Sequence, residues 1–182
     1  MGWLSKLIYK KFLGWQLAGN VTMSKDTIKK AVIIGAPHTS WHDFYIALLM
    51  RQVIGIKSNF VAKKELFKWP IKYYFQTIGG VSLDRRPGQN KVEAMAKMFE
   101  SREEFRLSLS PEGTRKKVDQ WKTGFYYIAK RAKVPIIMFT LDFEKKQNKV
   151  SEPFYPTDDL AADFAFMHSF YNGVKGKVPA LS

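Results

Sequence analysis

The stretch Ala36-Pro37-His38-Thr39-Ser40-Trp41-His42-Asp43 lies between two apolar runs of different periodicity. Residues 31–35, which precede it, form a short continuous apolar run typical of a buried strand. Residues 44–54, which follow it, repeat apolar side chains at helical spacing. The stretch is therefore predicted to form a strand-to-helix turn. Because ligands bind at the carboxyl ends of the strands in an α/β sheet, this turn is a candidate functional site.

His38 and Asp43 within this turn permit two interpretations. With Ser40 as the helix N-cap, Asp43 occupies the third helical position and faces His38 across one turn. Such a pair supplies the base and the orienting carboxylate of a catalytic triad, in which the free ring nitrogen removes a proton from a hydroxyl. Equally, Ser40-x-x-Asp43 is a capping box whose carboxylate only accepts backbone N–H groups. The turn alone favours the capping box, because capping boxes are more common than catalytic pairs.

A metal site is the third interpretation of this turn. His38 and His42 are four residues apart, which is the spacing of two metal ligands on one helix face. The chain has no cysteine, however, and its third histidine is the distant His168. Because a structural or catalytic metal needs at least a third side-chain ligand, no metal site is expected.

Strands and helices are predicted to alternate along the rest of the chain. Predicted strands cover residues 31–35, 58–62, 81–83, 105–109 and 134–141, with an edge strand at 150–155. Predicted helices cover residues 44–54, 89–101, 125–132 and 158–171, and residues 173–182 are expected to be a mobile tail. The pattern indicates a single α/β domain with a mainly parallel or mixed central sheet flanked by helices.

Two later stretches support the interpretation of the first as a functional site. They are Gly79-Gly80-Val81-Ser82-Leu83-Asp84-Arg85 and Ser110-Pro111-Glu112-Gly113-Thr114-Arg115. In this order, the three stretches resemble the His-x-x-x-x-Asp, Gly-x-x-x-x-Asp-Arg and Pro-Glu-Gly-Thr-Arg motifs of the glycerolipid acyltransferase family, typified by lysophosphatidic acid acyltransferase. Val134-Pro135-Ile136-Ile137 is similar to the Val-Pro-Ile block that closes the family's pattern. The resemblance covers about residues 31–140.

The resemblance implies an O-acyltransferase. The reaction moves a fatty acyl group from acyl-CoA or acyl carrier protein to a glycerol hydroxyl of a lysophospholipid, with conversion of lysophosphatidic acid to phosphatidic acid as the leading case. The acceptor hydroxyl attacks directly once His38 removes its proton, while Asp43 holds the tautomer of His38. Neither a metal nor a redox cofactor is required.

Four further residues are expected to bind the acceptor. The resemblance implies that Arg85 contacts the acceptor phosphate and that Glu112 and Gly113 help to bind the acceptor. Taken alone, Arg85 and its neighbour Arg86 are more typical of a solvated basic turn. Arg115 belongs to a group of cations beside the Pro-Glu-Gly-Thr turn that would hold a phosphate or an acidic acyl carrier.

The composition constrains the class of partner. A chain of 182 residues that is 46% hydrophobic is long enough for one domain with a sizeable core and is not wholly disordered. Its net charge of +14 predicts an anionic partner, which could be nucleic acid, an anionic membrane surface or a phosphorylated ligand. The charge by itself does not distinguish among these.

Residues 3–17 have the pattern of an amphipathic helix. Trp3 and Trp15 on its apolar face, with Lys11 near that face, suit a helix in a membrane interface, and packing against the domain is an equal alternative. Residues 1–30 are assigned to this helix and its connector, and residues 31–182 to the acyltransferase domain. No apolar run is long enough to span a bilayer, and lysines interrupt any signal-peptide core. A cytoplasmic protein, peripheral on the inner face of the membrane, is expected.

Two other functions compete with acyl transfer. One is a non-catalytic, basic module that binds lipid at a membrane surface, for which neither His38 nor Asp43 is needed. The other is nucleic-acid binding, which rests on the net charge and on lysines interleaved with aromatic residues from Lys63 to Phe75. No nucleic-acid-binding motif is present, so no nucleic-acid partner is expected. With the resemblance included, acyl transfer leads, and the oligomeric state stays open.

Overall fold

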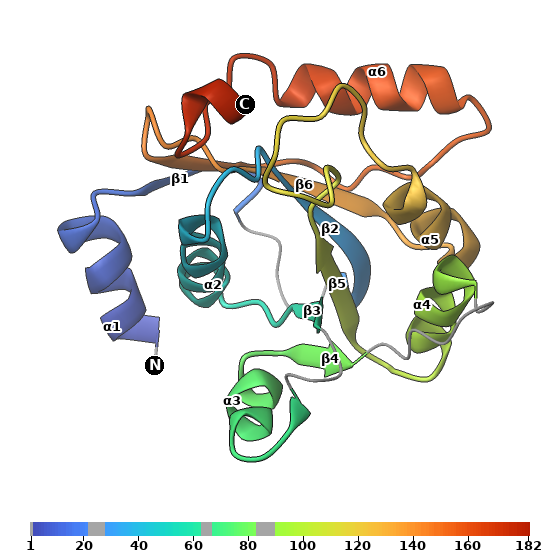
Figure 1. Ribbon diagram of the computed structural model, residues 1–182, viewed down its shortest axis with the longest axis horizontal. Helices are drawn as coiled ribbons and strands as arrows, with labels where there is room; N and C mark the ends of the chain where they lie inside the picture. Colours follow the sequence, from blue (N-terminus) through green and yellow to red (C-terminus); the bar gives the residue numbers. More distant parts are fainter. Residues whose placement is uncertain (1, 22–27, 63–66, 83–89) are drawn as a thin grey trace.

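A seven-stranded mixed sheet forms the centre of the molecule (Figure 1). The computed structural model describes residues 2–21, 28–62, 67–82 and 90–182. The strand order is β1-β7-β6-β2-β5-β3-β4, and each adjacent pair is parallel except β6 with β7. The strands are β1 (Gln16–Gly19), β2 (Lys30–Ala36), β3 (Asn59–Ala62), β4 (Gly80–Ser82), β5 (Phe105–Leu109), β6 (Ile136–Thr140) and β7 (Gln147–Val150). The predicted α/β class with a mixed central sheet is confirmed.

β2 occupies the centre of the sheet because, after Lys30, it has no polar side chain that would have to be exposed to solvent on either face. Every residue from 31 to 36 is buried, and so is every residue of β6. Parallel strands covered on both faces have this continuous apolar pattern. The strands predicted at residues 31–35 and 134–141 are therefore confirmed.

Helices cover both faces of the sheet, with α1 and α2 on one side and α4 and α5 on the other (Figure 1). Tyr9, Ile46 and Met50 pack against the sheet on the first side. α6 joins α4 and α5 in the core on the second side through Met167. The helices of the described residues are α1 (Gly2–Lys6), the π-helix η1 (Leu7–Phe12), α2 (His42–Ile54), α3 (Ile71–Thr77), α4 (Lys91–Glu100), α5 (Gly124–Ala132), α6 (Leu160–Phe170) and the 3-10 helix η3 (Pro179–Leu181).

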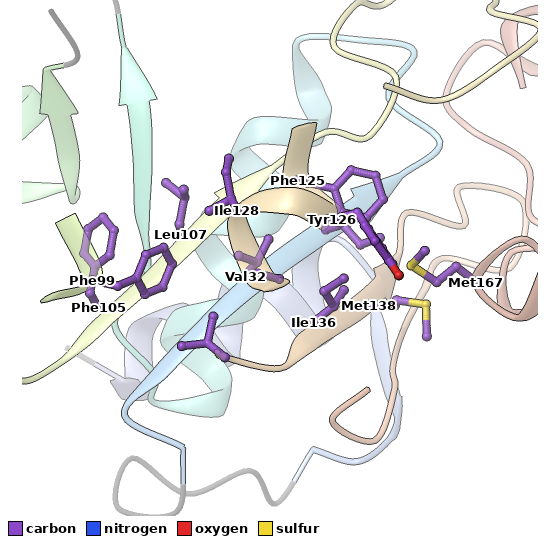
Figure 2. Close-up of a cluster of buried hydrophobic side chains, with 13 residues drawn as sticks. Val32, Phe99, Phe105, Leu107, Phe125, Tyr126, Ile128, Ile136, Met138 and Met167 are labelled. Atoms are coloured by element: carbon purple, nitrogen blue, oxygen red, sulfur yellow. The ribbon is translucent and has the colours of Figure 1, made fainter. Parts of the chain in front are cut away.

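The larger core joins the sheet to α4, α5 and α6. Figure 2 shows its side chains, including Val32, Leu107 and Ile136 from the sheet and Tyr126 from α5. Tyr126 donates a hydrogen bond of 2.8 Å from its hydroxyl to the buried Asp163 of α6. Burial, together with the Asp163 carboxylate, raises the pKa of Tyr126 to about 12, so the hydroxyl keeps its proton and ties α5 to α6.

The N-terminal segment is shorter as a helix than the sequence predicts. η1 ends at Phe12, and residues 16–19 form β1, which pairs with β7. Trp15, for which a membrane interface and packing on the domain are equal alternatives from the sequence, is buried, and its ring meets Phe143 edge-on with 4.9 Å between centroids. The prediction of a helix over residues 3–17 is wrong in this part because a distant strand determines the conformation of residues 16–19.

One face of the N-terminal helix packs on the domain. Tyr9 is fully buried and donates a hydrogen bond of 2.6 Å to the side-chain oxygen of Asn148 in β7. Trp3, Leu4 and Phe12 stay exposed. Packing on the domain, one of the two alternatives from the sequence, is therefore observed, and exposed apolar side chains remain beside it.

The C-terminal part differs from the prediction in two places. β7 lies between β1 and β6 rather than at an edge, and Phe154, within the predicted edge strand, forms only an isolated bridge with Ile136. The tail expected to be mobile instead folds back over the domain. Val178 donates a backbone hydrogen bond of 3.1 Å to the hydroxyl of Thr39, so the tail packs against the turn after β2.

Candidate functional site

The candidate site lies where β2 and β5 end. These adjacent parallel strands pair through Ile34 and Leu109. The turn after β2 and the turn after β5 therefore leave the same edge of the sheet side by side. The backbone N–H of His38 donates a hydrogen bond of 2.7 Å to Glu112 Oε2, which joins the two turns.

His38 and Asp43 form a hydrogen-bonded pair. His38 Nδ1 lies 2.9 Å from Asp43 Oδ2, and the side chains are 29% and 2% exposed. The carboxylate oxygen only accepts in this arrangement, so the neutral imidazole carries its hydrogen on Nδ1. Nε2 is then the nitrogen left to take a proton.

The same carboxylate also caps the turn. Asp43 Oδ2 accepts backbone hydrogen bonds of 2.8 Å from both Thr39 and Ser40. The His38–Asp43 contact and the capping arrangement, which the sequence presents as alternatives, are therefore both present. The predicted N-cap is wrong by one residue, because α2 begins at His42 and its N-cap is Trp41, which makes no side-chain capping bond.

Asp43 Oδ1 is buried and has no hydrogen-bond partner within the described ranges. The carboxylate therefore directs one oxygen to His38 and the backbone, and Asp43 is also one of the residues that line an apolar cavity. Buried polar atoms are nearly always paired in folded proteins, so an unpaired one beside a cavity suits contact with a bound molecule.

Glu112 and Gly113 occupy a tight turn directly after β5. Glu112 is buried, and its Oε2 also accepts from the Ser110 hydroxyl at 3.3 Å. Burial raises the pKa of the Glu112 carboxyl, and the hydrogen bond from His38 opposes this effect. Gly113 has a φ of +66°, which favours glycine, and an added Cβ would lie 2.7 Å from Lys122 Nζ.

Arg115, another predicted acceptor residue, is not part of this contact. Arg115 is exposed and has no hydrogen-bond or ion-pair partner among the described residues. Arg85 lies outside the described residues. The second histidine of the turn, His42, stacks on Trp41 with 3.9 Å between ring centroids and faces Ser40 rather than His38. Within the described ranges, no three side chains of histidine, cysteine, aspartate or glutamate gather as a metal site.

A narrow apolar cavity of about 200 Å³ runs from this pair along α2. His38 and Asp43 line it, and so do Arg51 and Ile54 near the other end of the helix. The walls are apolar side chains of α2 and of the sheet, including Phe44, Ala47, Leu48, Ile33, Ile137 and Phe139. The cavity is suited to a hydrocarbon chain whose polar end reaches His38.

Two small residues, Gly35 and Ala47, are among those that line this cavity. Gly35 lets the Phe139 ring pack directly over β2, since an added Cβ would lie 2.2 Å from the ring. Ala47 stands one helical turn after Asp43 on the cavity side of α2.

Arg51, near the far end of the cavity, is held by a hydrogen bond. Its Nη1 donates to the Ser58 carbonyl at 2.6 Å, and burial lowers the pKa of this guanidinium. Sequence reasoning missed the cavity, although a glycine within a strand often marks such a close approach.

Comparisons with family models and with solved structures both find proteins similar to this chain. The family model described as Acyltransferase matches residues 19–141, which is more than half of the chain. The crystal structure of the 1-acyl-sn-glycerophosphate (LPA) acyltransferase PlsC from Thermotoga maritima matches with a TM-score of 0.63 and 18% sequence identity, over 92% of this chain and 74% of that one. At this identity the structural match shows a shared fold. Comparison with curated protein sequences gives no significant match.

Proposed function

This chain belongs to the acyltransferase family and is an acyltransferase, and we propose that it transfers a fatty acyl group from acyl-CoA or acyl carrier protein to a glycerol hydroxyl of a lysophospholipid. Lysophosphatidic acid, which would become phosphatidic acid, is the first acceptor to test. The observation that carries the proposal is the His38–Asp43 pair at one end of an apolar cavity.

The proposed reaction is direct attack of the acceptor. His38 Nε2 takes the proton of the acceptor hydroxyl as its oxygen forms a bond with the thioester carbonyl carbon. The carbon–sulfur bond then breaks, and the proton passes from the imidazolium to the leaving thiolate. Asp43 keeps Nδ1 protonated and stabilises the imidazolium, while binding of both substrates in one site supplies proximity.

The acyl chain of the donor is proposed to occupy the cavity beneath α2. Its walls are apolar, and the thioester of a chain lying there would stand beside His38. A hydrocarbon chain gains the most from such walls because its transfer from water is favourable along its whole length. The cavity thus selects a long apolar donor rather than a short polar one.

The acceptor is proposed to bind at the other side of the pair. Glu112 Oε2 is engaged by His38 and Ser110, whereas Glu112 Oε1 has no partner among the described residues and can accept from an acceptor hydroxyl. Gly113 permits a close approach at that point. Arg115 is exposed in the same turn, and Arg85 remains the proposed phosphate contact from its motif.

The protein is further proposed to act at an anionic membrane surface, on the cytoplasmic face. Trp3, Leu4 and Phe12 of the N-terminal helix are exposed, and the net charge is +14. Exposed aromatic side chains and an excess of lysine suit an anionic interface. Among the described residues, no helix combines the length and the hydrophobicity needed to cross a bilayer.

Product analysis tests the proposed reaction. The purified protein is incubated with acyl-CoA, and in parallel with acyl carrier protein, together with lysophosphatidic acid. We expect phosphatidic acid by mass spectrometry in an amount equal to the thiol released, with at least one donor. Thiol release with free fatty acid as the sole product would instead indicate a thioesterase and would contradict acyl transfer.

A further inference from the structure

A second cavity, of about 680 Å³, lies on the opposite side of α2 from the proposed acyl-chain cavity. Leu13 and Trp15 from the N-terminal segment line it, together with Tyr45 of α2, the turn between β6 and β7, and the C-terminal tail. In Figure 1, α1, α2 and the C-terminal end gather on this side of the molecule. The proposed reaction uses none of these side chains.

The rim of this cavity has an excess of positive charge. Lys146, Lys175 and Lys177 line it, and Glu144 is the one acidic side chain among the described residues that does so. Lys175 Nζ lies 2.8 Å from Glu144, which neutralises that acid. Lys146 and Lys177 have no acidic partner within the described part of the chain. The cavity is therefore complementary to an anion, which two lysines can hold as point charges.

The walls and the surroundings of the cavity are aromatic and apolar. Trp15 and Phe143 pack together at its inner side, and Trp41 and Tyr45 meet edge-on at 5.4 Å between ring centroids. Trp41 is nevertheless 58% exposed and Tyr45 49% exposed, and Phe12, next to Leu13, is 76% exposed. An exposed apolar group of this kind beside a basic cavity indicates a ligand with both a charge and a hydrocarbon part.

We propose that this cavity binds the phosphate-bearing headgroup of an anionic membrane phospholipid that is not a substrate. Lys146 and Lys177 contact the phosphate, and Phe12, Leu13 and Trp41 enter the membrane interface around it. A soluble phosphate or nucleotide would satisfy the lysines but leave the apolar side chains in water. A lipid at a bilayer surface satisfies both, which is why a lipid is favoured over a soluble anion.

A headgroup bound at this cavity determines which side of the domain faces the bilayer. It also places the first cavity relative to the bilayer, because α2 forms a wall of both cavities. Trp41 at the second cavity and Asp43 at the first are two residues apart at the start of that helix. A bound headgroup thus holds the His38 site close to the bilayer that supplies lysophospholipids. This consequence rests on the proposed acyl transfer, whereas headgroup binding does not.

Vesicle sedimentation tests the headgroup site without donor or acceptor. The full chain is sedimented with phosphatidylcholine vesicles that contain phosphatidylglycerol, comparing wild type with the double variant Lys146→Gln, Lys177→Gln. We expect the double variant to bind about 25-fold more weakly, since each lysine at an anionic surface contributes about fivefold. The matched control, Lys91→Gln with Lys97→Gln on α4, loses the same charge from the opposite side of the sheet and is expected to bind nearly as wild type.

Three outcomes would overturn the headgroup site. Equal losses in the two double variants would mean that overall charge, not this cavity, drives binding. Equal binding of wild type to vesicles of phosphatidylcholine alone would remove the role of the anionic headgroup. The fluorescence of Trp41, assigned as the signal that is lost in Trp41→Phe, is also compared with inorganic phosphate and with vesicles. An equal shift with inorganic phosphate and with vesicles would indicate that the ligand is a soluble anion. Because no turnover is measured, these outcomes are independent of whether acyl transfer occurs.

Discussion

His38 and Glu112, which are 74 residues apart in the chain, are joined by a hydrogen bond of 2.7 Å from the His38 backbone N–H to the Glu112 carboxylate. The turn after β2 and the turn after β5 are therefore one physical unit. Glu112 supports the backbone that carries His38, in addition to the acceptor contact proposed for it. Each of these roles predicts a different response to substitution.

Removing the Glu112 carboxylate is expected to destabilise the fold. Glu112→Ala leaves the largely enclosed His38 N–H without its acceptor, which costs about 1–3 kcal/mol of unfolding free energy. Glu112→Gln keeps a side-chain oxygen at the same position and is the matched control. Urea unfolding monitored by tryptophan fluorescence measures both. Equal stability of Glu112→Ala and wild type would show that this hydrogen bond does not support the turn.

The pH dependence of stability is expected to change in Glu112→Gln. Burial raises the folded-state pKa of Glu112 above its unfolded value of 4.5, so the folded state binds this proton more tightly. This contribution to stability is fully present below pH 4.5 and is lost as the pH rises through the folded pKa. The unfolding free energy of the variant, minus that of wild type, should therefore rise over this interval. Parallel stability curves would contradict the raised pKa.

Asp43→Asn is expected to reduce turnover strongly. The amide oxygen has no full negative charge, so it accepts more weakly than Asp43 Oδ2 does from the His38 ring and from the two backbone N–H groups. It also no longer stabilises the imidazolium by charge. We expect a loss of about 10²–10⁴-fold in kcat, the range of a general-base contribution, with a smaller change in the acceptor KM. Steady-state kinetics test this. A raised KM at unchanged kcat would make Asp43 a structural residue.

Ala47→Phe is expected to shorten the acyl chain that the protein prefers. The added ring projects into the cavity along α2, so long-chain donors lose contact area while short-chain donors still fit. Competition between short-chain and long-chain acyl-CoA measures the shift in kcat/KM. Ala165→Phe, at an exposed position of α6, is the matched control and should leave the ratio unchanged. An unchanged ratio in Ala47→Phe would remove the acyl chain from this cavity.

Local sequence patterns predict those helices and strands whose own residues have the apolar spacing of a helix or a strand. β2 and β6 are continuous apolar runs, β5 alternates apolar and polar residues, and α4 and α5 have regular helical spacing, so these elements lie where the sequence predicts them. β1 has no such signal, because Gln16 to Gly19 becomes a strand only by pairing with β7. Trp15 likewise looks like an interfacial residue until Phe143, far along the chain, covers it.

The candidate site is predictable to the extent that it consists of motifs. His38, Asp43 and Glu112 lie in stretches that can be recognised, and the structure brings them together. The cavity along α2 is a product of how a helix packs on a sheet, and only Gly35 and Ala47 hint at it. The basic cavity on the other side of α2 combines side chains from four separate segments, none of which has a pattern of its own.

The most direct test of direct acyl transfer compares His38→Ala with His168→Ala, a histidine exposed on α6. Thiol release from long-chain acyl-CoA, or from acyl carrier protein if the CoA donor is inactive, is followed with and without lysophosphatidic acid. We predict acceptor-dependent release in wild type and in His168→Ala, and a reduction of about 10²–10⁴-fold in folded His38→Ala. Acceptor-dependent release at the wild-type rate in His38→Ala would contradict the role of His38 as the general base.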